Sequence, residues 1–134
     1  MDDQAAITSV LNEYYSAFST LDVQAIVHYY HEPSLFITPL GVNAVHTRAD
    51  MVSGFTTIIE GLRARGFARS ELSMLRIKHL SDTATLASGV ALRYRADGQE
   101  LERAGVTYLL YKTDSRWKIA VTVIHDANAN VQPE

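Results

Sequence analysis

The stretch TDSRWKIAVTVIHD, residues 113–126, combines a turn signal with a long apolar alternation. Apolar side chains recur at alternate positions after the turn at 114–116, as in a β-strand with one buried face. Adjacent strand residues point to opposite faces, so His125 and Asp126 cannot bond to each other as a catalytic pair. The apolar residues at alternate positions form one row, which holds most of the strand's apolar area and is expected to face the interior. Its members, if the alternation is unbroken, are Trp117, Ile119, Val121, Val123 and His125.

Segments before this strand have a similar composition. Residues 70–80, 83–95 and 102–113 are rich in Val, Leu, Ile, Thr and Tyr, and polar turn residues separate them. The dipeptide Asp97-Gly98 is a favoured hairpin turn. The second half of the chain is therefore predicted to be a meander of antiparallel strands.

Helical patterns occupy the first half of the chain. Apolar residues recur at helical spacing over residues 3–20, and the acidic start suits the positive end of a helix dipole. A second helix is predicted from Asp22 to the residue before Pro33, because a residue that precedes proline disfavours helical geometry.

A short strand and a third helix follow. The segment SLFITPLG, residues 34–41, is predicted to be a strand that Pro39 and Gly41 interrupt. Thr47 or Asp50 can cap a third helix, and Gly66 would end it in a left-handed conformation. Helices followed by an antiparallel meander predict an α+β fold.

Length and composition are those of one globular domain. The chain has 134 residues, 47% of them hydrophobic and 20% charged, and it contains no cysteine for disulfide or thiolate chemistry. We expect a single domain over residues 1–134 with a flexible tail at 127–134. The net charge of −3 argues against binding to nucleic acid or to anionic membranes. Because the start MDDQAA is unlike a secretory signal, a cytoplasmic protein is expected.

Both faces of the predicted strands carry apolar residues. Val90 and Leu92 share one face of their strand, and Ala87 and Ala91 share the other. Helices would cover one face of the sheet, so the other face needs a different cover. A second copy of the chain is the simplest cover, which predicts a homodimer through the outer sheet face.

The order of these elements resembles the NTF2-like superfamily, and more narrowly its SnoaL-like branch of small bacterial proteins. The matching segments are LDVQAIVHYY at 21–30, FITPLG at 36–41, the AspGlyGln hairpin at 97–99, and TDSRWKIAVTVIHD. The resemblance implies a cystatin-like cone, in which three N-terminal helices pack on a curved, mainly antiparallel sheet around a conical pocket. It also implies that dimers through the outer sheet face are common.

One departure from that family limits what can be transferred. Many relatives place His at alternate positions of the last strand and end it with Ser, whereas this chain has Val121, Val123 and His125 there. Activities that depend on the His pattern are therefore not expected to carry over.

The resemblance and the residues together predict a pocket for a small, largely apolar organic molecule. His125 would stand at its mouth as a base or donor, and Tyr14 could donate to a developing oxyanion, as first-helix tyrosines do in superfamily isomerases. His125 could equally be a half-exposed strand end, and Tyr14 a core residue with a satisfied hydroxyl. The other residues expected to bind ligand are Phe18, Tyr30, Phe55, Trp117, Val121 and Val123.

Two functions fit these residues. One is a binding protein without turnover. The alternative is a cofactor-free acid–base enzyme, related to isomerases, dehydratases or polyketide cyclases, that uses His125 and Tyr14. A fold that hosts many chemistries does not decide between them.

Two other groups of residues could bind ligands. His28, His31 and Glu32 lie within one stretch, but they do not match a HExxH arrangement, and neither a metal nor a cofactor is predicted. Arg93 and Arg95 are expected on the strand face opposite Leu92 and Tyr94. They could hold a carboxylate or could serve the solvent-facing surface.

Overall fold

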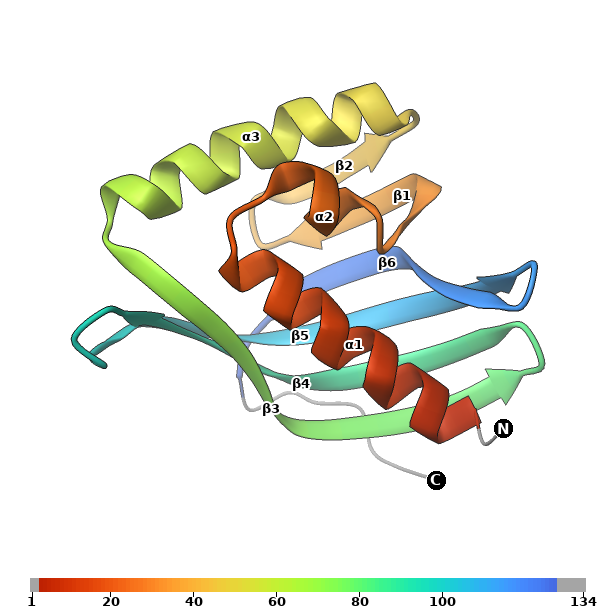
Figure 1. Cartoon of the computed structure of the whole chain (residues 1–134). Helices are drawn as coiled ribbons and strands as arrows, with labels where there is room; N and C mark the ends of the chain where they lie inside the picture. The colour runs from red at the N-terminus through yellow and green to blue at the C-terminus, as the bar shows by residue number, and fades with distance from the viewer. Residues whose placement is uncertain (1–2, 128–134) are drawn as a thin grey trace.

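The computed structural model describes residues 3–127, which form a curved six-stranded sheet with the helices packed on its concave face (Figure 1). The strand order is β2-β1-β6-β5-β4-β3, and the β1–β6 pair is parallel while the other described pairs are antiparallel. The elements are α1 (Asp3–Ser19), α2 (Val23–Val27), β1 (Tyr30–Thr38), β2 (Gly41–Val45), α3 (Arg48–Ala64), β3 (Phe67–Ser81), β4 (Ala84–Arg95), β5 (Glu100–Thr113) and β6 (Arg116–His125). The predicted α+β class and curved, mainly antiparallel sheet are confirmed.

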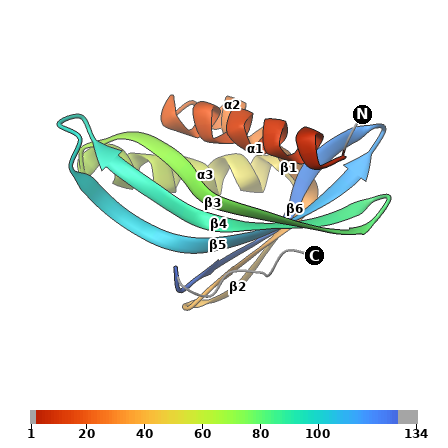
Figure 2. The ribbon, with the colours of Figure 1, turned by 90° about the horizontal axis from the view of Figure 1, so that it is seen from below.

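All helices lie on one side of the sheet, which curls around them (Figure 2). We call the sheet face toward the helices the inner face and the other the outer face. Along α1 the buried side chains recur at helical spacing and form one apolar stripe against the inner face, as the sequence predicts. No helix within residues 3–127 is long and apolar enough to cross a membrane. The tail expected at 127–134 lies outside the described residues, apart from Ala127.

The second helix is shorter than predicted. Asp22 caps α2 by accepting hydrogen bonds from the backbone of Gln24 and Ala25, but the helix ends at Val27 instead of continuing to Pro33. The chain turns into β1 at Tyr30, which pairs with Ile119 of β6. Sheet pairing therefore overrides the helical spacing after Val27. Strand β2 was not predicted, because it is an exposed edge strand without apolar alternation.

The third helix agrees with its predicted signals. Of the two candidate caps, Thr47 is the N-cap, and its side chain accepts a hydrogen bond from the backbone N–H of Asp50 at 3.1 Å. Gly66 follows the C-cap residue Arg65 and has φ +83°, the left-handed geometry that favours glycine.

A bulge in β6 changes which of its residues face the helices. Leu110 pairs with Ile119, whereas Leu109 pairs with Val121, so Ala120 is an extra residue between the two pairs. Before this bulge Trp117 and Ile119 point inward. After it Thr122 and Ile124 point inward, whereas Val121, Val123 and His125 point to the outer face. The predicted inner row is therefore confirmed for Trp117 and Ile119 and wrong for Val121, Val123 and His125, because the alternation shifts by one residue at Ala120.

Candidate functional site

A pocket of about 640 Å³ lies between the inner face of the sheet and the helices α1 and α3. Its walls are mainly apolar and include Phe18, Phe55, Val106 and Ile124. The strongly exposed Leu40, Val42 and Ile58 stand at its rim, on the β1–β2 turn, on β2 and on α3. A concave apolar site with few polar groups is the usual form of a small-molecule site.

Four tyrosines supply most of the buried polar groups of the pocket, and we call Tyr14, Tyr15, Tyr30 and Tyr108 the tyrosine cluster. The hydroxyls of Tyr14 and Tyr30 are 2.5 Å apart, and those of Tyr15 and Tyr108 are 2.7 Å apart. Adjacent positions on α1 thus reach β1 and β5. In each pair one O–H donates to the other oxygen, so the accepting tyrosine keeps its own O–H for another partner.

Burial keeps the tyrosine cluster protonated at neutral pH. Desolvation raises the pKa of Tyr14 to about 12, although the hydrogen bond with Tyr30 and the charge of Arg93 both oppose this effect. Desolvation also raises the pKa of Tyr15, and it raises those of Tyr30 and Tyr108 to well above the usual value. These phenols are therefore hydrogen-bond donors rather than bases.

Thr122 adds a further hydroxyl to this end of the pocket. It is buried on β6, and within residues 3–127 its Oγ1 has no hydrogen-bond partner of regular geometry. It lies close enough to Tyr30 to lower that pKa slightly, but this proximity does not amount to a regular bond. A buried hydroxyl without a partner is unfavourable by about 1–3 kcal/mol, which a ligand with a suitable acceptor or donor would relieve.

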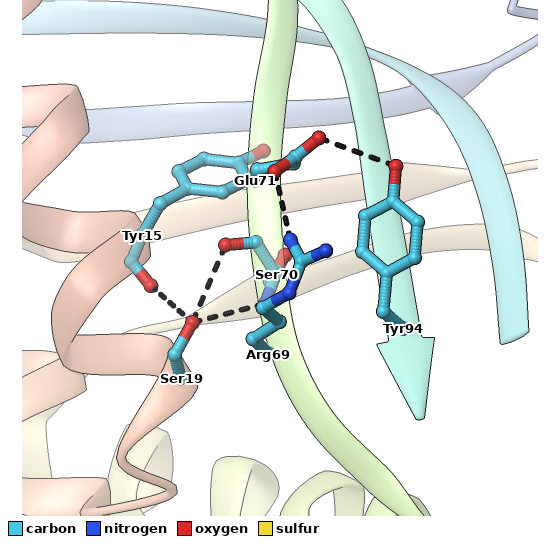
Figure 3. Close-up of polar contacts among 6 residues, drawn as sticks. All are labelled: Tyr15, Ser19, Arg69, Ser70, Glu71 and Tyr94. Atoms are coloured by element: carbon cyan, nitrogen blue, oxygen red, sulfur yellow. Dashed lines mark hydrogen bonds and ion pairs between the residues drawn. The ribbon is translucent and has the colours of Figure 1, made fainter. Parts of the chain in front are cut away.

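Ser19 holds the last turn of α1 on β3 (Figure 3). Its Oγ accepts a hydrogen bond from the backbone N–H of Ser70 at 2.9 Å. Its single proton can donate to the carbonyl of Tyr15 at 2.9 Å or to that of Ser70 at 3.3 Å. Because Tyr15 is one turn from Ser19, this contact helps to fix the tyrosine hydroxyls relative to the sheet.

Arg93 carries the positive charge of the pocket. It lies on the inner side of β4, with its guanidinium 5.1 Å from the ring centre of Phe18. The Nη1 atom of Arg93 is 3.6 Å from Oε1 of Glu102. The Nη1 atom of Arg65 is closer to the same oxygen, at 2.8 Å. The structure thus places the Arg93 side chain at the pocket and not on the outer surface of the sheet.

The predicted site residues divide between the two faces. Tyr14, Phe18, Tyr30 and Phe55 line the pocket. Trp117 is buried on the inner side but is not part of the lining; its ring lies 5.8 Å from the Lys112 ammonium. The predicted placement of Val121, Val123 and His125 in the pocket is wrong, because the bulge turns all three outward.

His125 belongs to a hydrogen-bonded chain on the outer face. Its Nε2 is 2.8 Å from Oγ1 of Thr107, which is 3.0 Å from Oγ of Ser88, and its Nδ1 is 2.7 Å from the Asp126 carbonyl. The ring lies against Gly105, where a Cβ would come within 2.5 Å of Nδ1. In the sequence, the only sign of this close packing is a glycine within a predicted strand, because its pairing with His125 comes from the register.

His28 and His31, which are close together in the sequence, lie at different elements of the structure. His28 caps α2 and is exposed, while His31 lies on β1 with Nδ1 2.9 Å from the carbonyl of Pro33. The charge of Lys118 is the main cause that lowers the pKa of His28. Within residues 3–127, no group of three or more His, Cys, Asp or Glu side chains could hold a metal ion.

Sequence reasoning missed several residues of the pocket. Tyr15 and Tyr108 could have been found only by knowing that α1 crosses β5, since they are far apart in sequence and bond through their hydroxyls. Thr122 was not expected in the pocket, because an unbroken alternation was predicted along the last strand. The bulge at Ala120 interrupts that alternation and turns Thr122 inward.

Comparison with known proteins places this geometry in a family. The sequence model of a family described as NTF2-like protein (DUF6841) matches residues 2–127. No curated protein is significantly similar in sequence.

Solved structures share the fold at low sequence identity. An NTF2-like protein of unknown function from Shewanella oneidensis is 18% identical with a TM-score of 0.76, and the match covers 93% of this chain and 100% of that one. An NTF2-like protein with a cystatin-like fold from Novosphingobium aromaticivorans is 13% identical with a TM-score of 0.76, and the match covers 95% of this chain and 83% of that one. The protein Aln2 from a Streptomyces species is 15% identical with a TM-score of 0.76, and the match covers 93% of this chain and 91% of that one. At these identities the likeness concerns the fold.

Proposed function

The chain belongs to the NTF2-like family (DUF6841), and we propose that its pocket binds a small, largely apolar organic molecule that carries a hydrogen-bond-accepting oxygen. The NTF2-like, cystatin-like fold predicted from the sequence is thereby confirmed. The narrower resemblance to the SnoaL-like branch stays a prediction. The observation that supports the proposal most is the tyrosine cluster, whose hydroxyls stand in an otherwise apolar pocket.

The pocket favours an acceptor oxygen for a physical reason. Each tyrosine pair keeps one O–H without a partner within residues 3–127, and the hydroxyl of Thr122 is also unbonded there. A carbonyl or ether oxygen can accept from these donors, whereas a pure hydrocarbon would leave them unpaired in an apolar environment. The apolar walls then bury the remainder of the molecule.

The acid–base alternative has less support. The acid–base enzyme hypothesis used His125 and Tyr14 together as catalytic groups, but their side chains lie on opposite faces of the sheet. The raised pKa of Tyr14 leaves the phenol as a donor at neutral pH, so it cannot replace the missing base. Binding without turnover is therefore the function that we propose.

We also propose that the protein is a homodimer through the outer face of the sheet. Val121 and Val123 of β6 and Leu109 of β5 lie together on that face and are only partly buried. Apolar side chains on a sheet face without covering helices are typical of an interface between copies.

Titration calorimetry with two probes that share a naphthalene ring tests the proposed ligand class. We expect 2-naphthamide, which has an acceptor oxygen, to bind at least about fivefold more tightly than 2-methylnaphthalene, in line with about 1 kcal/mol for one buried hydrogen bond. A triple variant with Tyr14→Phe, Tyr30→Phe and Thr122→Val removes the donors at one end of the tyrosine cluster and should reduce that difference, while the Tyr15–Tyr108 pair keeps part of it. The control His125→Ala should retain it, because His125 lies outside the pocket. Equal affinities for both probes, or no binding of either, would contradict the proposal.

A further inference from the structure

The pocket contains a guanidinium group whose hydrogen-bonding capacity is largely unused. Arg93 has five N–H donors. Within residues 3–127 it forms no hydrogen bond. Its ion pair with Glu102 is long, with 3.6 Å between Nη1 and Oε1. Its side chain is 27% exposed, so most of it has been removed from water. A partly buried guanidinium that lacks bonded partners can gain much from a suitable anion.

The negative charge next to Arg93 is already shared with another cation. Arg65 donates to Oε1 of Glu102 at 2.8 Å, which is closer than the contact from Arg93. One carboxylate therefore faces two guanidinium groups, and this corner of the pocket keeps a net positive charge. The Phe18 ring holds the Arg93 guanidinium over its face, which fixes the group at the pocket wall.

The other ionised residue of the pocket lies away from this corner. Asp50 is in the first turn of α3, and Arg65, which shares Glu102 with Arg93, follows the other end of that helix. A helix rises ~1.5 Å per residue, which separates positions 50 and 65 by ~22 Å. The carboxylate of Asp50 is therefore no substitute for a ligand anion at Arg93.

From this arrangement we infer that the ligand of the pocket is a carboxylate, with Arg93 as its counter-ion and its apolar body between Phe18, Phe55 and Val106. This inference rests on the proposed function, because it specifies the chemistry of the accepting oxygen. A planar carboxylate matches the fork of N–H groups on arginine, whereas a neutral amide offers one weaker acceptor. An aromatic or alicyclic monocarboxylic acid combines such a group with a body that suits the apolar walls.

Calorimetry with 2-naphthoate and its neutral counterpart 2-naphthamide separates this inference from the proposed function. We expect wild-type protein to bind 2-naphthoate at least about tenfold more tightly than 2-naphthamide, as a charge-assisted pair implies. Arg93→Gln should abolish that preference and leave the affinity for 2-naphthamide within about twofold of wild type. Arg93→Lys should keep part of the preference, since it retains the charge but not the fork.

A matched control and the ionic strength make the test specific. Arg76→Gln removes the same charge from an exposed position on β3 and should keep the preference for 2-naphthoate. The preference should also weaken as salt is raised. If 2-naphthamide binds but 2-naphthoate binds no more tightly, or if Arg93→Gln keeps the preference, the inference is wrong and the proposed function stands. If neither probe binds, both are wrong.

Discussion

In the function that we propose, the hydroxyl groups of the tyrosine cluster select the molecules that the pocket accepts. Tyr14 and Tyr15 are neighbours on α1, but their rings diverge and reach hydroxyls on β1 and β5. The ring centres of Tyr14 and Tyr15 are 5.4 Å apart and nearly perpendicular, a favourable edge-to-face contact. Packing thus fixes the direction of the polar groups before any ligand arrives.

The raised tyrosine pKa values predict a loss of stability in alkaline solution. Desolvation raises the pKa of Tyr14 to about 12, whereas the unfolded chain ionises near the ordinary value of 10.0. The folded protein therefore holds its proton to higher pH, and the free energy of unfolding should fall as pH rises from about 10 to 12. For Tyr14 alone this loss is on the order of 3 kcal/mol. Guanidinium unfolding at pH 8, 10 and 11 should show about half of this loss, since the change is complete only above the folded pKa.

Tyr14→Phe is the control for this pH dependence. It removes the ionisable group and should flatten the decline between pH 10 and 11 compared with wild type. An equal slope in the two proteins would show that Tyr14 ionises in the folded state as easily as in water.

The bond between Tyr14 and Tyr30 predicts a second effect at this scale. Tyr30→Phe leaves the ring packing in place but removes one of the two hydroxyls. The free energy of unfolding should fall by about 1 kcal/mol, the net value of a buried hydrogen bond. Tyr111→Phe is the matched control, because Tyr111 is 43% exposed, and its effect should be close to zero. Equal effects in urea unfolding would count against a stabilising pair.

At the scale of single elements, the bulge in β6 decides the composition of the pocket. Without it, Val121, Val123 and His125 would point inward, and the pocket wall would have a different chemistry. The sequence predicted the elements well where local signals act, as at the Thr47 cap and the Gly66 stop. It failed at Ala120, because a bulge depends on pairing with two neighbouring strands and leaves no mark in the alternation.

The same limit applies to the start of β1. The stretch that follows Val27 has helical spacing, yet Tyr30 pairs with Ile119 across the sheet. Parallel pairing of β1 with β6 joins segments from different halves of the chain, and no local signal encodes such a contact. Tyr14 and Phe18 could be placed at the pocket from the sequence, because they lie on an apolar helix face that helical spacing reveals directly.

Substitution of Gly105 tests how closely β5 and β6 pack beyond the bulge. Gly105→Ala would bring a Cβ within 2.5 Å of the His125 ring and into the backbone carbonyl of Asp126. Because the nearest atom belongs to the backbone and not to the end of a flexible side chain, the free energy of unfolding should fall by about 1–3 kcal/mol. Gly61→Ala is the control: its Cβ meets no atom within 4 Å on α3, and it should stabilise the protein by up to ~1 kcal/mol. Thermal unfolding of both variants gives the two signs, and a neutral Gly105→Ala would contradict the close packing.

At the scale of the whole molecule, the two sheet faces have different tasks. The inner face holds the pocket, and the outer face presents Leu109, Val121 and Val123 to the surroundings. We predict a dimer through the outer face, with a mass of twice 14.9 kDa in light scattering at micromolar concentration. Val121→Glu should yield the single-chain mass, since it buries a charge at the interface, while Thr57→Glu on the exposed side of α3 should not. A single-chain mass for wild type would remove the dimer.

Methyl NMR during titration with 2-naphthoate tests the central claim most directly, because one strand carries residues of both faces. Beyond the bulge, Ile124 lies in the pocket, whereas Val121 and Val123 lie on the outer face. An aromatic ligand shifts nearby methyl resonances, so the account predicts large shifts for Ile124 and for Val106 opposite it, and small shifts for Val121 and Val123. The reverse pattern, with Val121 and Val123 shifted and Ile124 unchanged, would contradict the account.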